Sequence, residues 1–324
     1  MSATVSGSWW QRGAYRVIAL LGGLYLGWAL GANDASNVFG TAVGARIISF
    51  RHAAILCAVA VIAGAALQGE AGIHTLSGLT TQTRTTLVIV SVSAALTVTL
   101  MTFIGLPIST SQAMVGAITG IGLATRDISG SGLLKVVICW VTTPVGAMLF
   151  SIIIYYVLKF ILSKLRLSIL TRDKLLWGGL VVVGTYGSYA LGANNVANAT
   201  GIYSGQIPGL EDIHLALIGG GAIALGVLTF SRRVMTSVGT KLMRLDAFTA
   251  LISVTSMATT IHIFSLIGVP VSTSQAIIGA IMGIGLMQDY RNVKFKMLKN
   301  FGAGWILTPV IAFLFSAAAY AIFT

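Results

Sequence analysis

Charge is the scarcest property of this sequence, because only 9% of its 324 residues are charged. An ordinary soluble domain carries roughly a quarter, and 20 basic and 8 acidic residues cannot cover a surface of this size. The two cysteines, Cys57 and Cys139, lie in apolar stretches and fit buried thiols better than a disulfide scaffold or a metal cluster. These shortages exclude a cytosolic enzyme, a disordered chain and a disulfide-stapled secreted domain, and leave an all-α integral membrane protein.

Apolar residues make up 56% of the chain and gather in ten segments. Most are near the length of about 20 residues that crosses a bilayer core. Five segments precede a basic linker at 159–174, predicted to be cytoplasmic, and five follow it, so we expect one membrane repeat at 1–158 and a second at 175–324. The predicted segments are 15–44, 53–69, 86–106, 108–124, 133–162, 175–204, 213–230, 249–269, 271–288 and 300–323.

The two halves share motifs in the same order, which indicates an internal duplication. Residues 107–123 (PISTSQAMVGAITGIGL) match 270–286 (PVSTSQAIIGAIMGIGL) at 13 of 17 positions. The stretch ALGANDASNVFG at 29–40 likewise matches ALGANNVANATG at 190–201. Because five segments is an odd number, the second half must enter the membrane from the opposite side. This predicts two inverted-topology repeats, an architecture of many secondary transporters.

Basic residues are spread unevenly over the predicted loops and set the orientation. The net charge is +12, and 5 of the 20 basic residues fall on the side of the N-terminus while 15 fall on the other. By the positive-inside rule the second side is cytoplasmic, so both termini are expected outside the inner (plasma) membrane of the cell. The basic excess then faces lipid headgroups of the bilayer, and we expect no nucleic-acid partner.

The third and fourth segments of each half are joined by a tight Gly-x-Pro turn. A Ser-Thr-Ser-Gln cluster follows each proline and suits a tip at the membrane midplane, which favours re-entrant helical hairpins over pairs of full spans. Each tip begins a helix, so free N–H groups and hydroxyls point at one place and form an anion site without lysine or arginine. The predicted oxyanion ligands are Asn37, Ser109, Thr110, Ser111, Gln112, Asn198, Ser272, Thr273, Ser274 and Gln275.

Asp34 is the acidic residue that the sequence places inside an apolar segment. A carboxylate at membrane depth is costly and faces a partner or a cavity, and no basic residue is expected at that depth. Gly31 and Asn33 beside it predict a discontinuous helix, whose freed carbonyl oxygens can join the carboxylate around Na⁺. We therefore predict cation ligands at Asn33, Asp34, Asn194 and Asn195, which occupy corresponding places in the two halves.

The stretch Gly-Ala-Asn-Asp-Ala-Ser-Asn-Val-Phe-Gly-Thr-Ala-Val-Gly at 31–44 resembles the signature of the inorganic phosphate transporter (PiT) family. The stretch GANNVANA at 192–199 and the two Pro-x-Ser-Thr-Ser-Gln motifs are similar to that family as well, so the resemblance covers essentially the whole chain. It implies a homodimeric secondary transporter that binds phosphate between the repeat motifs and the hairpin tips. Na⁺ or H⁺ would move alongside as the coupling ion, with no cofactor.

Two features depart from the family's usual pattern. The second repeat has Asn195 where the family usually has aspartate, and the tips end in Gln112 and Gln275 where histidine is frequent. Losing a carboxylate removes one negative charge from a site that must hold an anion, and it alters the expected cation stoichiometry. The family also has sulfate-permease relatives, so a permease for sulfate or another tetrahedral oxyanion is the alternative to phosphate import.

Two other classes of function are disfavoured. A passive anion channel would use the same hydroxyls, but a broken helix and gated hairpins argue against it. A membrane-embedded enzyme would need a nucleophile with a base or a metal cluster, so we predict that the protein is not an enzyme. His262 is expected to be a satisfied core residue and Glu70 to lie at the outer interface. The prediction is therefore cation-coupled import of phosphate by alternating access.

Overall fold

The computed structural model describes residues 9–104, 108–165, 167–238, 245–288 and 295–324. Within these ranges every regular element is a helix, which confirms the predicted all-α class. In chain order the elements are α1 (Trp9–Gly44), α2 (Phe50–Gln68), α3 (Glu70–Ser77), α4 (Arg84–Ile104), α5 (Thr110–Thr125), α6 (Gly130–Lys164), α7 (Ile169–Thr200), the 3₁₀ helix η1 (Gly201–Tyr203), α8 (Asp212–Val238), α9 (Ala247–Leu266), α10 (Thr273–Met287) and α11 (Phe295–Phe323).

All ten predicted apolar segments correspond to helices, and several helix starts follow directly from the sequence. A serine precedes five of the helices, and its hydroxyl accepts a hydrogen bond from the backbone N–H three residues later, as N-cap residues do. These caps are Ser49, Ser109, Ser129, Ser168 and Ser272. Helix α3, with eight residues, is not among the predicted segments, because it is short and its sequence, which includes Glu70 and His74, is less apolar than that of α2.

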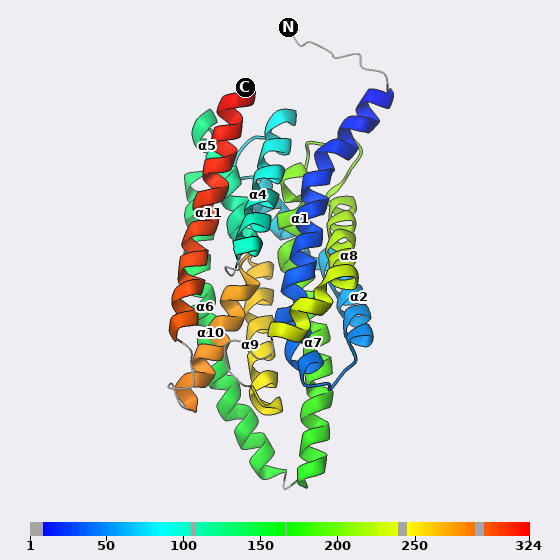
Figure 1. The fold of residues 1–324 in the computed structure, drawn as a ribbon, viewed down its shortest axis with the longest axis vertical. Coiled ribbons are helices and arrows are strands. Elements are labelled where there is room, and N and C mark those ends of the chain that lie inside the picture. The colour runs from blue at the N-terminus through cyan, green and yellow to red at the C-terminus, as the bar shows by residue number, and fades with distance from the viewer. Residues whose placement is uncertain (1–8, 105–107, 166, 239–244, 289–294) are drawn as a thin grey trace.

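Helices α4 and α5 form one hairpin and helices α9 and α10 form a second, at opposite ends of the molecule (Figure 1). Helix α4 begins and α5 ends toward one end of the molecule, α9 begins and α10 ends toward the other, and the starts of α5 and α10 both lie near the middle. Re-entrant hairpins stay a prediction, because α4 and α9 are each long and apolar enough to cross a membrane. Helix α10 has 15 residues, so it is only about 22 Å long and cannot cross a core of about 30 Å. Helix α1 begins and helix α11 ends at one end, opposite the α6–α7 connection.

The two halves of the chain interlock instead of packing as separate bodies. Helix α1 packs mainly on α8, and α2 packs on α7. The second helix of each hairpin packs on the last helix of the other half, α5 on α11 and α10 on α6. Each of these contacts has a counterpart in which the halves are exchanged, as a two-fold relation between the halves requires.

Glycine lets crossing helices approach to backbone contact at equivalent places in the two halves. A Cβ atom on Gly31 of α1 would collide with the carbonyl oxygen of Ile223 on α8. In the same way, a Cβ atom on Gly192 of α7 would collide with the carbonyl oxygen of Val61 on α2. Small residues at such crossings are the usual means of close helix packing in membranes.

Helix α1 is unbroken from Trp9 to Gly44, so the predicted break at Gly31 and Asn33 is wrong. Gly31 provides the close approach to Ile223 and does not end a helix. The Ser36 hydroxyl also donates to the carbonyl oxygen of Asn33 at 2.6 Å, within the continuous helix. Backbone carbonyls next to Asp34 are therefore not freed for a cation, and a discontinuity lies instead at Gly69, between α2 and α3.

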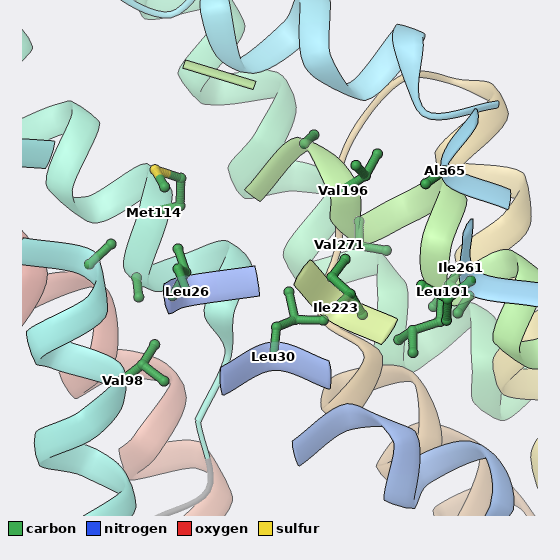
Figure 2. Close-up of a cluster of buried hydrophobic side chains, with 14 of the residues drawn as sticks. Leu26, Leu30, Ala65, Val98, Met114, Leu191, Val196, Ile223, Ile261 and Val271 are labelled. Atoms are coloured by element: carbon green, nitrogen blue, oxygen red, sulfur yellow. The ribbon is translucent and has the colours of Figure 1, made fainter. Parts of the chain in front are cut away.

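The hydrophobic core fills the centre of the molecule, where the two halves meet. Figure 2 shows buried side chains from helices of both halves and from the turn of the second hairpin, including Leu26, Leu30, Ala65, Val98, Met114, Leu191, Val196, Ile223, Ile261 and Val271. Polar groups placed within this core are in an apolar environment, where an unpaired donor or acceptor is costly.

Seven helices in the described part of the chain are long and apolar enough to cross a membrane. They are α2, α4, α6, α7, α8, α9 and α11. Helices α6 and α11 form an outer face, because only 11% and 17% of the residues in their most apolar stretches are buried. Exposed apolar side chains along two whole helices fit a protein covered by lipid, which agrees with a multi-pass membrane protein.

Candidate functional site

Three asparagines of α7 connect the two hairpin tips at the centre of the molecule. Asn198 donates to the hydroxyl of Ser111 on the first tip at 2.8 Å, and Asn195 donates to the hydroxyl of Thr273 on the second at 3.0 Å. Asn194, Asn195 and Asn198 share one face of the helix through their three- and four-residue spacing, and all three are buried. The predicted site residues of the second repeat motif and of both tips therefore lie together.

The side chain of Asn194 binds the backbone of the turn that precedes α10. Its side-chain amide donates to the carbonyl oxygen of Val271 at 2.8 Å, and its side-chain oxygen accepts from the N–H of Val271 at 3.0 Å. This two-way bond gives a buried turn residue the pairing that a sheet or helix would otherwise supply. In this conformation Asn194 acts as a brace for the second tip.

Asn195 links the asparagine cluster to Asp34. Its side-chain oxygen accepts from Asn194 at 3.2 Å and from Asn198 at 3.0 Å, and its amide donates to Thr273. The Thr273 hydroxyl in turn lies close enough to the carboxylate of Asp34 to interact with it. Asp34 is 5% exposed, so the sequence prediction of a buried carboxylate is confirmed. The Thr273 hydroxyl therefore lies between the equivalent positions of the two repeat motifs, bonded to Asn195 and close to Asp34.

The two hairpin tips bind each other through a reciprocal pair of hydrogen bonds. Ser111 of the first tip donates to the carbonyl oxygen of Val271 at 3.1 Å. Ser274 of the second tip donates to the carbonyl oxygen of Ile108 at 3.0 Å. In the repeated motif Ser111 corresponds to Ser274, and Ile108 corresponds to Val271. The two bonds are therefore the pair that the predicted two-fold relation between the halves would produce.

The first turns of α5 and α10 both face this centre. Ser109 accepts from the N–H of Gln112 at 3.3 Å, and Ser272 accepts from the N–H of Gln275 at 3.3 Å. Each serine satisfies one N–H of the first turn and leaves others without a partner inside the helix. These N–H groups, and the positive ends of the two helix dipoles, favour an anion between the tips. The remaining donors are the N–H groups of Thr110, Ser111, Thr273 and Ser274.

Unpartnered acceptors also surround the tips. Among the described residues, the side-chain oxygens of Gln112, Asn198 and Gln275 are buried and have no hydrogen-bond partner. A buried acceptor without a donor costs about 1–3 kcal/mol, and such groups in a native structure call for an explanation. The centre therefore presents acceptors as well as donors.

Asn33 and Asn37 lie on α1 beside Asp34 and are partly exposed. Their four-residue spacing places them on one side of the helix, and within the described chain neither side chain makes a hydrogen bond. His262 has both ring nitrogens occupied, one by Tyr186 at 2.7 Å and the other by Gln68 at 2.6 Å. The prediction that His262 is satisfied is thus confirmed, but the residue is only partly buried and does not lie in the core.

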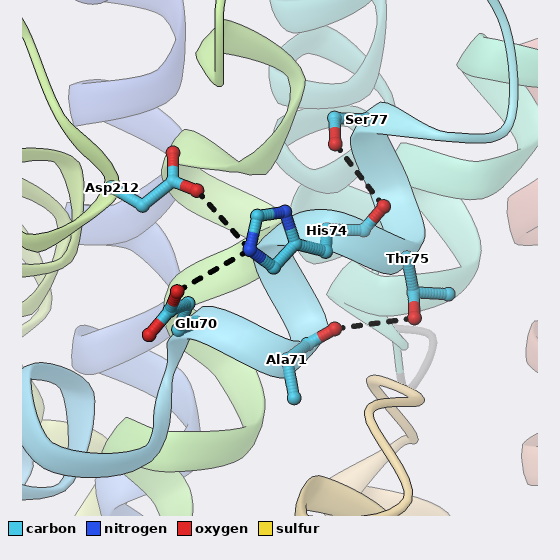
Figure 3. Close-up of polar contacts among 6 residues, drawn as sticks. All are labelled: Glu70, Ala71, His74, Thr75, Ser77 and Asp212. Atoms are coloured by element: carbon cyan, nitrogen blue, oxygen red, sulfur yellow. Dashed lines mark hydrogen bonds and ion pairs between the residues drawn. The ribbon is translucent and has the colours of Figure 1, made fainter.

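The fold also gathers three residues that the sequence did not connect, Glu70, His74 and Asp212 (Figure 3). Glu70 and His74 are four residues apart on α3, so they share a helix face, but Asp212 begins α8 in the other half. The one local signal was the Glu70–His74 spacing, and no pattern in the sequence indicates that α8 begins beside it.

Comparison with known proteins gives a consistent set of relatives. A family model described as the phosphate transporter family matches residues 30–316. The sulfate permease CysP of Bacillus subtilis (strain 168) is 33% identical over 313 residues, which are 94% of this chain and 87% of the relative. The Methanocaldococcus jannaschii protein named "Putative phosphate permease MJ0630" is 28% identical over 298 residues, covering 92% of this chain and 94% of the relative.

One solved structure, described as "The sodium-dependent phosphate transporter", has the same fold. It superposes with a TM-score of 0.85 at 24% sequence identity, over 95% of this chain and 98% of that chain. The similarity confirms the helical architecture over nearly the whole length. The range matched by the family model, 30–316, includes every predicted site residue.

Proposed function

Because the chain belongs to the phosphate transporter family, we propose that it imports inorganic phosphate with a coupled cation, Na⁺ or H⁺, by alternating access. The observation that carries this proposal is the buried centre where two hairpin tips with the same Ser-Thr-Ser-Gln sequence meet the asparagines of α7. Substrate sites of secondary transporters commonly lie at such a midpoint between inverted repeats.

The mixture of donors and acceptors at the tips supports phosphate as the substrate. Backbone N–H groups at the starts of α5 and α10 bind oxyanion oxygens. Phosphate near neutral pH also carries one or two O–H groups, and these can donate to one or two of the unpartnered oxygens of Gln112, Gln275 and Asn198. Sulfate has no O–H group and would leave those oxygens unpaired at a cost of about 1–3 kcal/mol each.

Asp34 supplies a reason for coupling to a cation. It is buried on α1 and joined through Thr273 to the second tip, so an oxyanion at the tips and an ionised Asp34 would repel each other in a medium of low dielectric constant. A Na⁺ ion or a proton at Asp34 removes this repulsion. Binding of the cation and of the anion then favour each other reciprocally.

The packing of the hairpins supports a mechanism in which they move between two positions. Gly116 of α5 lies against the backbone of Pro309 in α11, and Gly279 of α10 lies against the backbone of Pro144 in α6. Contacts of this kind present a smooth helix surface, and within the described part of the chain two serine hydrogen bonds join the tips directly to each other. We propose that each hairpin opens toward its own end of the molecule in turn.

Two further parts of the proposal concern the setting of the protein. We place both termini outside the plasma membrane, since the basic residues gather at the other side. We also propose a homodimer, as the family resemblance implies. Blue native electrophoresis and cysteine labelling of the α6–α7 connection in intact cells test these two statements.

Sulfate is the second candidate substrate, because the sulfate permease CysP is 33% identical. Asn195 stands where the family usually has aspartate, and an amide at this position offers donors to an anion that a carboxylate cannot. A sulfate permease would use the same tips and the same buried Asp34.

Uptake into proteoliposomes tests the function. Labelled phosphate and labelled sulfate are supplied separately, each with a Na⁺ gradient, with a proton gradient and with neither. We expect phosphate to accumulate against its gradient with one of the two cations, and Asp34→Asn to abolish that accumulation. Asp173→Asn, which changes a partly exposed carboxylate near the start of α7, is the matched control and should transport like the parent.

Each alternative gives a different result in the same assay. Preferential accumulation of sulfate would identify sulfate, the second candidate, as the substrate in place of phosphate. Equilibration without accumulation would indicate a passive channel, and uptake by Asp34→Asn equal to that of the parent would refute the coupling mechanism.

A further inference from the structure

Glu70, His74 and Asp212 form a cluster away from the hairpin tips, between α3 of the first half and the start of α8 in the second. The Nε2 atom of His74 lies 3.4 Å from a carboxylate oxygen of Glu70 and 3.5 Å from one of Asp212. Figure 3 shows both carboxylates aimed at this one nitrogen. The three side chains offer ligand atoms that all lie within 4.8 Å of one another.

These distances suit metal ligands better than hydrogen bonds. An N–H···O hydrogen bond usually measures about 2.7–3.2 Å, and one ring N–H cannot serve two carboxylates well. Ligands about 2.0–2.1 Å from a tetrahedral Zn²⁺ ion are separated from each other by about 3.4 Å, which matches both observed separations. Two carboxylates and a neutral imidazole carry two negative charges, which balance a divalent cation.

Helix dipoles do not by themselves account for the cluster. Glu70 and Asp212 each stand in the first turn of a helix, where a negative side chain is stabilising. That effect explains why each position is acidic, but it gives no reason for Asp212 of α8 to point at a histidine of α3. The side chains of His74 and Glu70 are 60% and 75% exposed and that of Asp212 is 19% exposed, so an ion from solution can reach the cluster.

A neighbouring pocket supplies a second, independent observation. A pocket of about 350 Å³ is lined by Glu70 and His74 together with Leu67, Gln68, Ala71, Ser265 and Leu266. The Ser265 hydroxyl is buried, at 3% residue exposure, and has no hydrogen-bond partner among the described residues. Ser265 therefore places an unpartnered polar group at a pocket that two of the three ligand residues, Glu70 and His74, also line, and this fits water on that side of the cluster.

We propose that Glu70, His74 and Asp212 bind a divalent transition-metal ion of the Zn²⁺ type, with water completing its coordination on the pocket side. One imidazole and two carboxylates are ligands that Zn²⁺ accepts, and three protein ligands leave a position open. The ion ties α3 to α8 and thereby joins the two halves of the chain at this end. The proposal does not depend on which anion is transported.

Direct binding of Zn²⁺ to the purified full chain tests the site. Any affinity tag is removed, the protein is treated with a chelator, and ZnCl₂ is titrated by isothermal calorimetry in detergent. We expect one saturating Zn²⁺ ion per chain. Loss of an outer-shell partner alone weakens metal binding about 10–100-fold, so His74→Ala and Asp212→Asn should each weaken it at least about 100-fold.

The control is His52→Ala, which removes another exposed histidine, paired with Ser49 at the start of α2, and should leave the affinity unchanged. X-ray absorption at the zinc edge should show a nitrogen and oxygen shell with imidazole scattering that disappears in His74→Ala. Melting temperatures without metal establish that the variants are folded, and the isosteric Asp212→Asn carries the test if the alanine variant is not. No saturable binding by the parent, or parent-like binding by Asp212→Asn, overturns the site.

Discussion

Replacing Gly192 by alanine should force helices α7 and α2 apart. The added Cβ atom would collide with the carbonyl oxygen, carbonyl carbon and Cα atom of Val61, all of which are backbone atoms and cannot rotate away. The helices must therefore separate by roughly 1 Å to restore ordinary contact, and a gap of that size loses a quarter to a half of each dispersion contact across it.

The magnitude follows from two opposing effects. Overpacking of a tight interior costs about 1–3 kcal/mol, whereas exchanging glycine for alanine inside a helix gains up to about 1 kcal/mol. Gly178 lies on the same helix with nothing within 4 Å of a Cβ atom, so Gly178→Ala receives the gain without the collision. The difference between the two variants therefore isolates the collision, and for a chain of 324 residues about 2 kcal/mol corresponds to about 3 °C in melting temperature.

Transport should respond more strongly than stability. Gly192 precedes Asn194 by two residues, and Asn194 holds Val271 at 2.8 and 3.0 Å. A displacement of about 1 Å breaks such bonds, and misplacement of this size at a functional site commonly costs up to about 100-fold in rate. Thermal unfolding in detergent and uptake into proteoliposomes measure the two effects. If Gly192→Ala and Gly178→Ala have the same melting temperature and the same rate of uptake, the close contact between α7 and α2 does not exist in the membrane.

Two other predictions address the site and the loops. Thr273→Val removes the hydroxyl between the two repeat motifs and should lower uptake at least about tenfold, because it leaves buried polar groups unpaired. The control, Thr260→Val, loses only a bond to its own helix and should transport normally. Equal uptake by the two variants would contradict the proposed link. The hydroxyl and N–H of Thr81 hold the pKa of Asp127 below its ordinary value of 3.8. The stability that this contact supplies is present above that value and is lost as the pH falls through the lower native pKa. The melting temperature of Asp127→Asn should therefore fall less steeply with acid than that of the parent, and parallel curves would refute this contribution.

The sequence was sufficient for the helices because their positions are recorded in local patterns. Apolar segments of near-constant length predict spans, and serine before a helix predicts its start, as at Ser109 and Ser272. The duplicated Ser-Thr-Ser-Gln motif also predicted which residues would share the centre. Each of these inferences needed only composition, spacing or internal repetition.

Features that depend on a partner helix could not be predicted in this way. Gly31 has two possible uses, to end a helix or to admit a neighbour, and only the position of α8 decides between them. The brace that Asn194 makes with the backbone of Val271 is likewise set by tertiary packing. Asp212 joins His74 across the interface between the halves, and no local signal marks such a meeting.

The interlocked packing of the halves also governs how the chain can be made. Helix α1 is synthesised first, but the helix on which it packs, α8, follows roughly 200 residues later, a delay of about 10–40 s at about 5–20 residues per second. During that time the glycine face of α1 and the carboxylate of Asp34 have only lipid, the insertion machinery or early neighbours beside them. Packing of α1 therefore has to wait until the second half has reached α8, and until then the newly made first half is incomplete.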